Sequence, residues 1–188
     1  MTSLDKYFID AQNYQTVATQ SAQQSLEQLR RDIYDSHRHR IFALAYYMTH
    51  NEIEAERLLV KTFTRGFCAP TLPNGAVLDG LLVEELRRGG ILGEASVVGK
   101  MEERLEMIAC DAEMSEKGVR RTDLEEALQH LPPDLRLTFL LHDVESYSPE
   151  QIASLLEIPT GLAFKNVMRA RIAMRLAVMK AKTERMSA

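Results

Sequence analysis

Apolar residues recur at three- and four-residue spacing along most of this chain, which predicts helices rather than strands. In the N-terminal half the predicted helices are Asp32–His50, Asn51–Phe67 and Ala76–Arg88. Their expected buried residues are Ile33, Ile41, Leu44, Ala45 and Met48 in the first helix, and Ile53, Ala55 or Leu58, Leu59, Phe63 and Phe67 in the second. Pro70 and Pro73 mark a loop before the third helix. Residues 1–25 are polar and rich in Gln, so we expect a mobile arm that becomes helical near Leu26.

Prolines divide the C-terminal part into short amphipathic helices. Thr122 or Asp123 is expected to cap a first helix. Pro132-Pro133 ends that helix, because the second proline holds the first in an extended conformation. A second helix is predicted over Asp134–Val144.

A helix-turn-helix is predicted from Ser148 onwards. Ser148 supplies a hydroxyl N-cap, Pro149 occupies the first helical position, and Glu150 places an acid in the first turn. Ile158-Pro159-Thr160-Gly161 predicts a tight turn, after which Thr160 caps a long last helix. Two short helices joined by such a turn form the unit that lays its second helix in a DNA major groove.

Together these elements predict an all-α protein made of two small helical domains. The first domain is a three-helix bundle over residues 26–90, and the second is a helix-turn-helix domain over residues 122–188. Residues 91–121 form the linker, in which Lys100–Met114 has a helical pattern. The length of 188 residues suits one or two small domains.

Positive charge is concentrated near the C-terminus, although the net charge of the chain is −4. The cations between residues 165 and 185 are Lys165, Arg169, Arg171, Arg175, Lys180, Lys182 and Arg185, against Glu184 alone. A locally basic helix can bind phosphates while the rest of the protein stays acidic. For any one of these residues the alternative is a solvated helix face whose arginine stems cover apolar surface.

The sequence gives no support for enzymatic chemistry, metal binding or membrane insertion. It contains no glycine-rich phosphate loop and no metal-spaced Cys/His set, so we expect no catalytic residue, cofactor or small-molecule substrate. His37 and His39 point to different sides of a helix. Cys68 and Cys110 are expected to be free thiols in a reducing cytoplasm. No apolar run is long enough to span a bilayer, and no secretory signal is visible.

Two blocks of the chain resemble bacterial sigma-70 factors of the extracytoplasmic-function (group 4) type. The C-terminal block lies within 124–175, contains LEEALQHLPPDLR, YSPEQIASLLEIPTG and RAR, and resembles the promoter-binding region 4 of these proteins. The N-terminal block lies within 32–67, contains RIFALAYYMTHNEIEAERLLVKTFTRGF, and resembles the region 2 helices that grip core RNA polymerase.

The resemblance implies a transcription initiation factor whose partners are core RNA polymerase and promoter double-stranded DNA, with an anti-sigma factor as a further candidate partner. The implied polymerase-binding residues are Glu54, Glu56, Arg57, Lys61, Thr62 and Arg65. The implied DNA-binding residues are Thr160, Lys165, Asn166, Arg169, Arg171 and Arg175. An ordinary amphipathic surface helix is the alternative for the first set.

The helix predicted over Ala76–Arg88 departs from the family pattern. Family members carry there an aromatic residue and an Arg-Asn pair that melt and read the −10 element, whereas this chain has Asp79, Glu84 and Glu85. Unpaired bases are held by aromatic stacking in a cationic groove. Two added carboxylates in this segment are therefore expected to repel single-stranded DNA.

The last helix also departs from the family pattern. Phe164, Met168 and Ile172 form an apolar stripe where polar or basic residues are usual, beside the stripe expected to face the core. Four explanations remain: a wider core contact, for example with a linker helix over Lys100–Cys110, a surface for a partner protein, contact with thymine methyl groups, or sequence drift without a function.

Two further functions remain as alternatives. A sigma-like regulatory protein could keep the fold but not promoter melting, and would bind an anti-sigma factor or another protein, or pack its two domains on each other. The acidic segment and the apolar stripe favour this alternative. More distantly, the chain could be a one-component regulator that binds a palindromic site as a homodimer.

Overall fold

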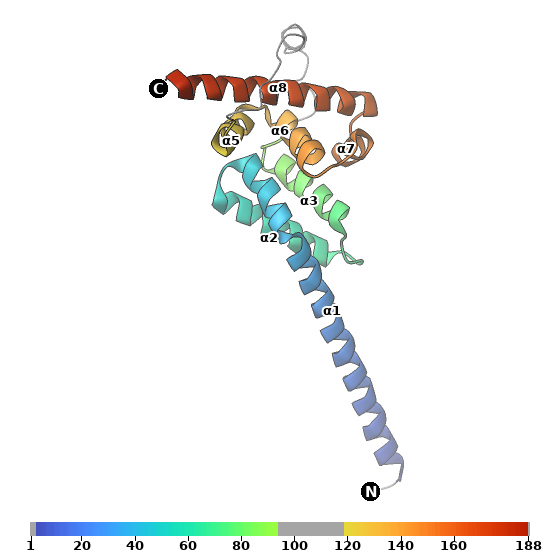
Figure 1. The fold of residues 1–188 in the computed structure, drawn as a ribbon. Coiled ribbons are helices and arrows are strands. Elements are labelled where there is room, and N and C mark those ends of the chain that lie inside the picture. Colours follow the sequence, from blue (N-terminus) through green and yellow to red (C-terminus); the bar gives the residue numbers. More distant parts are fainter. Residues whose placement is uncertain (1–2, 94–118, 188) are drawn as a thin grey trace.

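The computed structural model describes residues 3–93 and 119–187, with side chains described for residues 22–93 and 119–185. Every regular element in these residues is a helix, which confirms the predicted all-α class (Figure 1). The elements are α1 (Ser3–Thr49), α2 (Glu52–Cys68), α3 (Gly75–Arg88), α5 (Arg121–His130), α6 (Pro133–Phe139), the π-helical η1 (Leu140–Val144), α7 (Pro149–Leu156) and α8 (Thr160–Ser187). None of these helices is both long enough and apolar enough to cross a membrane.

The first unit is formed by α1, α2 and α3, with local caps at the starts of α2 and α3. The side-chain oxygen of Asn51 accepts a hydrogen bond from the Glu54 amide (3.2 Å), and that of Asn74 accepts one from the Val77 amide (3.0 Å). Each cap satisfies a backbone donor that has no partner within its helix. The buried apolar residues of this unit are Ile41, Leu44, Ala45, Met48, Ala55, Leu58, Phe63, Leu78, Leu82, Val83, Leu86 and Leu92.

Two details of the first unit differ from the sequence prediction. Helix α1 already begins at Ser3, so the stretch up to Leu26 is helical rather than irregular, and it projects away from the other helices (Figure 1). Gln and Ala are good helix formers, which allows a helix without a continuous apolar face. Ile53 is exposed rather than buried. Side chains two positions apart on an α-helix point in directions that differ by about 200°, so Ile53 lies opposite the buried Ala55.

The second unit is formed by the helices from α5 to α8. Helix α7 begins as predicted: Ser148 accepts from the Gln151 amide (3.2 Å), and the Gln151 side chain accepts from the Ser148 amide (2.8 Å). Helix α5 begins earlier than expected, because Asp123 lies in its first turn and accepts from the Arg120 amide (2.9 Å). The expectation of an N-cap at Thr122 or Asp123 is therefore wrong.

The turn before α8 also differs slightly from the prediction. The Ala163 amide donates to the Pro159 carbonyl (3.1 Å), so Thr160 is already the first residue of the helix and not its cap. Helix α7 ends at Leu156, and the next residue, Glu157, adopts the left-handed conformation (φ 56°) that lets the chain reverse. The tight turn that was predicted between the two helices is thus present.

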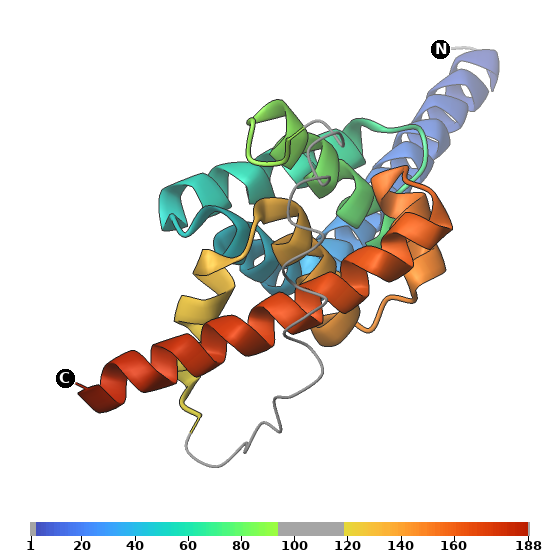
Figure 2. The same cartoon turned by 90° about the horizontal axis from the view of Figure 1, so that it is seen from above.

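The two units pack against each other. Helix α8 lies across α5, α6 and α7, and α1 to α3 lie on the other side of those helices (Figures 1 and 2). Helix α3 contacts α7, helix α1 contacts α6, and a single hydrophobic core continues through both units. The predicted linker helix Lys100–Met114, with Cys110, lies outside the described residues.

Candidate nucleic-acid interface

Helix α8 has one buried face and one exposed face. The buried face is the predicted core stripe, Ala163, Val167, Ala170 and Met174, and continues with Val178 and Ala181. The exposed face carries Phe164 and Met168, which are 49% and 57% exposed. Helix α8 is thus held by the helices beneath it while its outer side stays open to solvent, as a recognition helix requires.

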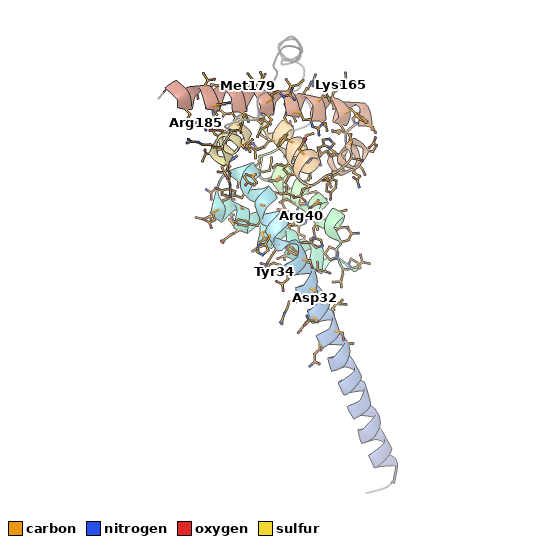
Figure 3. All side chains as sticks on the ribbon, in the orientation of Figure 1. Asp32, Tyr34, Arg40, Lys165, Met179 and Arg185 are labelled. Atoms are coloured by element: carbon orange, nitrogen blue, oxygen red, sulfur yellow. The ribbon has the colours of Figure 1, made fainter. Side chains whose placement is uncertain are left out.

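The residues expected to bind DNA do not all share that outer side. Those exposed are Thr160, Lys165, Arg171 and Arg175. Lys165 lies near the N-terminal end of α8 (Figure 3), and Arg169 is half-buried. Asn166 is only 5% exposed, and its side chain lines a small cavity between α8, α6 and the end of α3. The fold therefore places Asn166 away from any DNA that lies on the outer side.

Some cations of α8 are held by carboxylates of neighbouring helices. Arg171 Nε and Nη2 lie 2.8 and 2.7 Å from the Asp143 carboxylate of η1. Near the other end of α8, Arg185 donates to Asp123 of α5 (2.7 Å; Figure 3). The hydrogen bond from the Arg120 amide lowers the pKa of the Asp123 carboxyl most, and the hydrogen bond and charge of Arg185 lower it further. These pairs fix α8 on the unit and reduce the charge that is available for phosphates.

Helix α2 presents most of the expected polymerase-binding residues to solvent. Glu56, Arg57 and Lys61 are exposed, and Arg57 forms a local ion pair with the half-exposed Glu54 (2.7 Å). Thr62 is fully buried and belongs to the core instead. Within the described residues, no group of three or more His, Cys, Asp or Glu side chains is arranged to hold a metal ion.

The carboxylates of α3 are paired within the protein. Glu85 is almost fully buried and accepts from Arg65 (2.9 Å) and Arg88 (3.0 Å), while the exposed Glu84 accepts from Arg65 (2.6 Å). Asp79 is 1% exposed. The expected repulsion of single-stranded DNA stays a prediction. It now depends on the exposed Glu84, because Asp79 and Glu85 are buried and paired with cations.

Asp79 joins the two units. Its carboxylate accepts from Arg40 of α1 (2.8 Å) and from the hydroxyl of Tyr147, which lies in the loop before α7. Glu145 lies 3.6 Å from the same Arg40 guanidinium. Burial, together with the hydrogen bond and charge of Asp79, raises the pKa of Tyr147 to about 12.

Arg136 of α6 forms a second junction between the units. Its guanidinium donates to the carbonyls of Gln129 (2.6 Å), Leu131 (3.0 Å) and Met48 (3.1 Å), the last at the C-terminal end of α1. His50 Nδ1 lies 3.2 Å away. Burial lowers the pKa of Arg136, and burial together with the Arg136 charge lowers the pKa of His50. A buried arginine therefore holds the end of α1 against the second unit.

The sequence prediction missed the structural roles of Arg40, Arg136 and Tyr147. Arg136 stands alone in the apolar run LRLTFLL, and an isolated arginine in such a run is a signal for a buried hydrogen-bonding role. The buried position of Asn166 could also have been predicted from the sequence. It lies three residues after Ala163 and four before Ala170, so helical spacing already places it on the core stripe.

Part of the second unit matches a known protein family. Residues 121–174 match the family described as Sigma-70, region 4. Among characterised proteins, the ECF RNA polymerase sigma factor SigE of Mycolicibacterium smegmatis is 26% identical over 176 residues, which cover 86% of this chain. The match spans 65% of that relative's length, which is less than two thirds.

The fold is also similar to a solved sigma factor. The sigma factor RpoE of Bartonella quintana, solved in complex with the anti-sigma factor NepR, matches with a TM-score of 0.57 and 17% identity. The match covers 79% of this chain and 96% of that chain, and at this identity it concerns the fold alone. The helix-turn-helix of α7 and α8 thus lies within the residues that match Sigma-70, region 4, and a sigma factor of the extracytoplasmic-function type is similar to 86% of this chain.

Proposed function

We propose that this chain directs bacterial RNA polymerase to promoters, docking to the core enzyme through α2 and binding promoter DNA through α7 and α8. The observation that carries the proposal is the region 4 helix-turn-helix, whose second helix is anchored on one face and open on the other. The chain has no catalytic role in this mechanism. Because RpoE was solved with an anti-sigma factor, we include such a protein among the partners.

Two further observations support the proposal. The outer sides of α2 and α8 are both exposed while the units are packed together, so both surfaces are open to a partner. Asp79 and Glu85 are buried and paired with Arg40 and Arg65, which compensates much of the negative charge that would oppose promoter melting. That negative charge was one of the features that favoured a regulator without melting activity. Each surface can bind weakly, because the second contact occurs at high effective concentration once the first has formed.

Run-off transcription with purified core polymerase and the full chain tests the proposal as a whole. We expect transcripts that start at defined positions only when the chain is added. A chain that neither joins core polymerase nor changes its start sites would contradict the proposal.

Replacing Arg175 with alanine is expected to weaken promoter binding similarly at every sequence, because an exposed arginine at this place meets phosphate. The slope of log K against log salt should become shallower by about 0.9. Holoenzyme binding to a labelled promoter, titrated at several salt concentrations, measures both effects. Arg31→Ala is the matched control, since Arg31 is an exposed arginine of α1, and it should leave affinity and slope unchanged. Equal slopes for both variants would remove Arg175 from the DNA contacts.

Replacing Glu56 with lysine is expected to weaken capture of core polymerase roughly tenfold, because it reverses an exposed charge within the proposed docking surface. Co-purification with tagged core enzyme over a concentration series gives the affinity. Glu126→Lys makes the same change at an exposed position of α5 and should have no effect. Loss of capture in both variants, or in neither, would mean that α2 is not the docking helix.

A further inference from the structure

The first three turns of α8 offer an unusual set of side chains to a major groove. The exposed side chains there are Thr160, Phe164, Lys165 and Met168. Base edges are read by the N-terminal residues of a recognition helix. Two of the side chains expected to read guanine or adenine edges are positioned otherwise, since Asn166 is buried and Arg171 is held by Asp143, whereas Lys165 is exposed and Arg169 is half-buried.

We propose that Phe164 and Met168 read promoter DNA by packing against thymine methyl groups. This inference rests on the proposed function, because it requires α8 to lie in a major groove. Thymine is the only base with a methyl group in that groove, and apolar side chains are its natural contacts. The two residues are one turn apart, about 6 Å along the helix. That distance is close to the rise of two base pairs, roughly 7 Å.

The surroundings of the pair favour DNA over a protein partner. Lys165 directly follows Phe164 and so lies beside the stripe, and Arg175 lies about two turns beyond Met168. Both cations are exposed, so they flank the apolar side chains where phosphates would lie. The positive end of the helix dipole adds to this field. Protein-binding patches usually extend over several hundred Å² of contiguous apolar surface. Here Ile172 is half-buried, and the next large exposed apolar residue on the helix is Met179.

The test removes single methyl groups from DNA. Holoenzyme, formed from core polymerase and the full chain, is used to select a promoter from random duplexes. Deoxyuridine, which lacks only the methyl group of thymine, then replaces each thymine of the element that α8 protects. Burial of one methyl group corresponds to about fourfold in affinity. We therefore expect losses of that size at one or two thymines, within two base pairs of each other.

Variants assign the effect to residues. Met168→Ala and Phe164→Ala should each weaken binding to the thymine duplex and abolish the deoxyuridine penalty at one position. Met179→Ala replaces an exposed methionine further along the same helix and should preserve both affinity and penalty. Alanine is a good helix former, so these exposed substitutions leave α8 intact.

The possible failures are distinguishable. If the holoenzyme selects a promoter but tolerates deoxyuridine at every position, thymine methyl groups are not read, and this inference fails while the proposed function stands. The same conclusion follows if the alanine variants keep the penalty but lose binding to an anti-sigma protein, which would make the pair a protein-binding surface. If no holoenzyme forms, or none binds DNA, the proposed function itself fails.

Discussion

Replacing Arg136 with methionine is expected to lower the free energy of unfolding by about 3 kcal/mol. Arg136 is 8% exposed, and its guanidinium donates to carbonyls at the ends of two helices, Met48 in α1 and Gln129 in α5, and to Leu131 just after α5. Methionine fills much of the volume but donates no hydrogen bond. The carbonyls would then stay buried without a partner, and each such group destabilises the folded state.

Thermal unfolding followed by circular dichroism measures the effect of the Arg136 substitution. For a chain of this size, the expected loss corresponds to a melting temperature lower by roughly 6–12 °C. Arg121→Met is the matched control: the side chain of Arg121 is 84% exposed and pairs with Glu125 within α5. It should melt like the parent protein. If Arg136→Met and Arg121→Met have the same melting temperature, Arg136 does not stabilise the junction.

Replacing Asp79 with asparagine is expected to lower the free energy of unfolding by about 2 kcal/mol, because hydrogen bonds to charged groups are the stronger ones. Asparagine keeps the shape of the side chain but removes the charge that compensates Arg40. The nearest remaining carboxylate is that of Glu145, 3.6 Å from the guanidinium. The Tyr147 hydroxyl would also donate to a neutral acceptor instead of a carboxylate.

Tyrosine titration gives Asp79→Asn a second readout. The pKa of Tyr147, about 12 in the folded protein, should fall in the variant, because the charge of Asp79 helps to raise it. In the unfolded chain this pKa is about 10. The unfolded chain therefore loses the proton first, so the stabilising contribution of the hydroxyl is complete below about pH 10 and is lost as the pH rises towards 12.

Asp35→Asn provides the comparison for Asp79→Asn, since Asp35 is an exposed aspartate of α1 that pairs only loosely with Arg38 (3.7 Å). It should change neither the unfolding curve nor the tyrosine titration. A tyrosine titration of Asp79→Asn that coincides with that of the parent protein would mean that Asp79 and Tyr147 do not interact in solution.

Local chemistry explains why most helix boundaries could be predicted from the sequence. Asn51, Ser148 and the prolines act through their own backbone neighbours, so the sequence reveals them directly. Helix α1 before Leu26 was missed because its helix-forming residues produce no apolar period. The Thr122 cap failed because Asp123 accepts from Arg120 instead.

The candidate site could be predicted only in part, because burial and pairing depend on residues far apart in the chain. The basic helix and its core stripe follow from spacing. That Arg171 is held by Asp143, and that Asp79 meets Tyr147, depends on how the helices pack, and no local pattern encodes this. The acidic character of α3 was visible in the sequence, but its neutralisation by Arg40 and Arg65 was not.

Dividing the chain between its two units would leave polar groups without their hydrogen-bond partners in both fragments. A fragment ending near residue 93 would keep Asp79 and Arg40 but lose the tyrosine that covers them. A fragment starting near residue 119 would keep Arg136 without the α1 carbonyls. Both pieces would also expose apolar surface from the shared core, so they would be prone to aggregate. The intact polypeptide, and not its halves, is therefore the proper material for biochemical work.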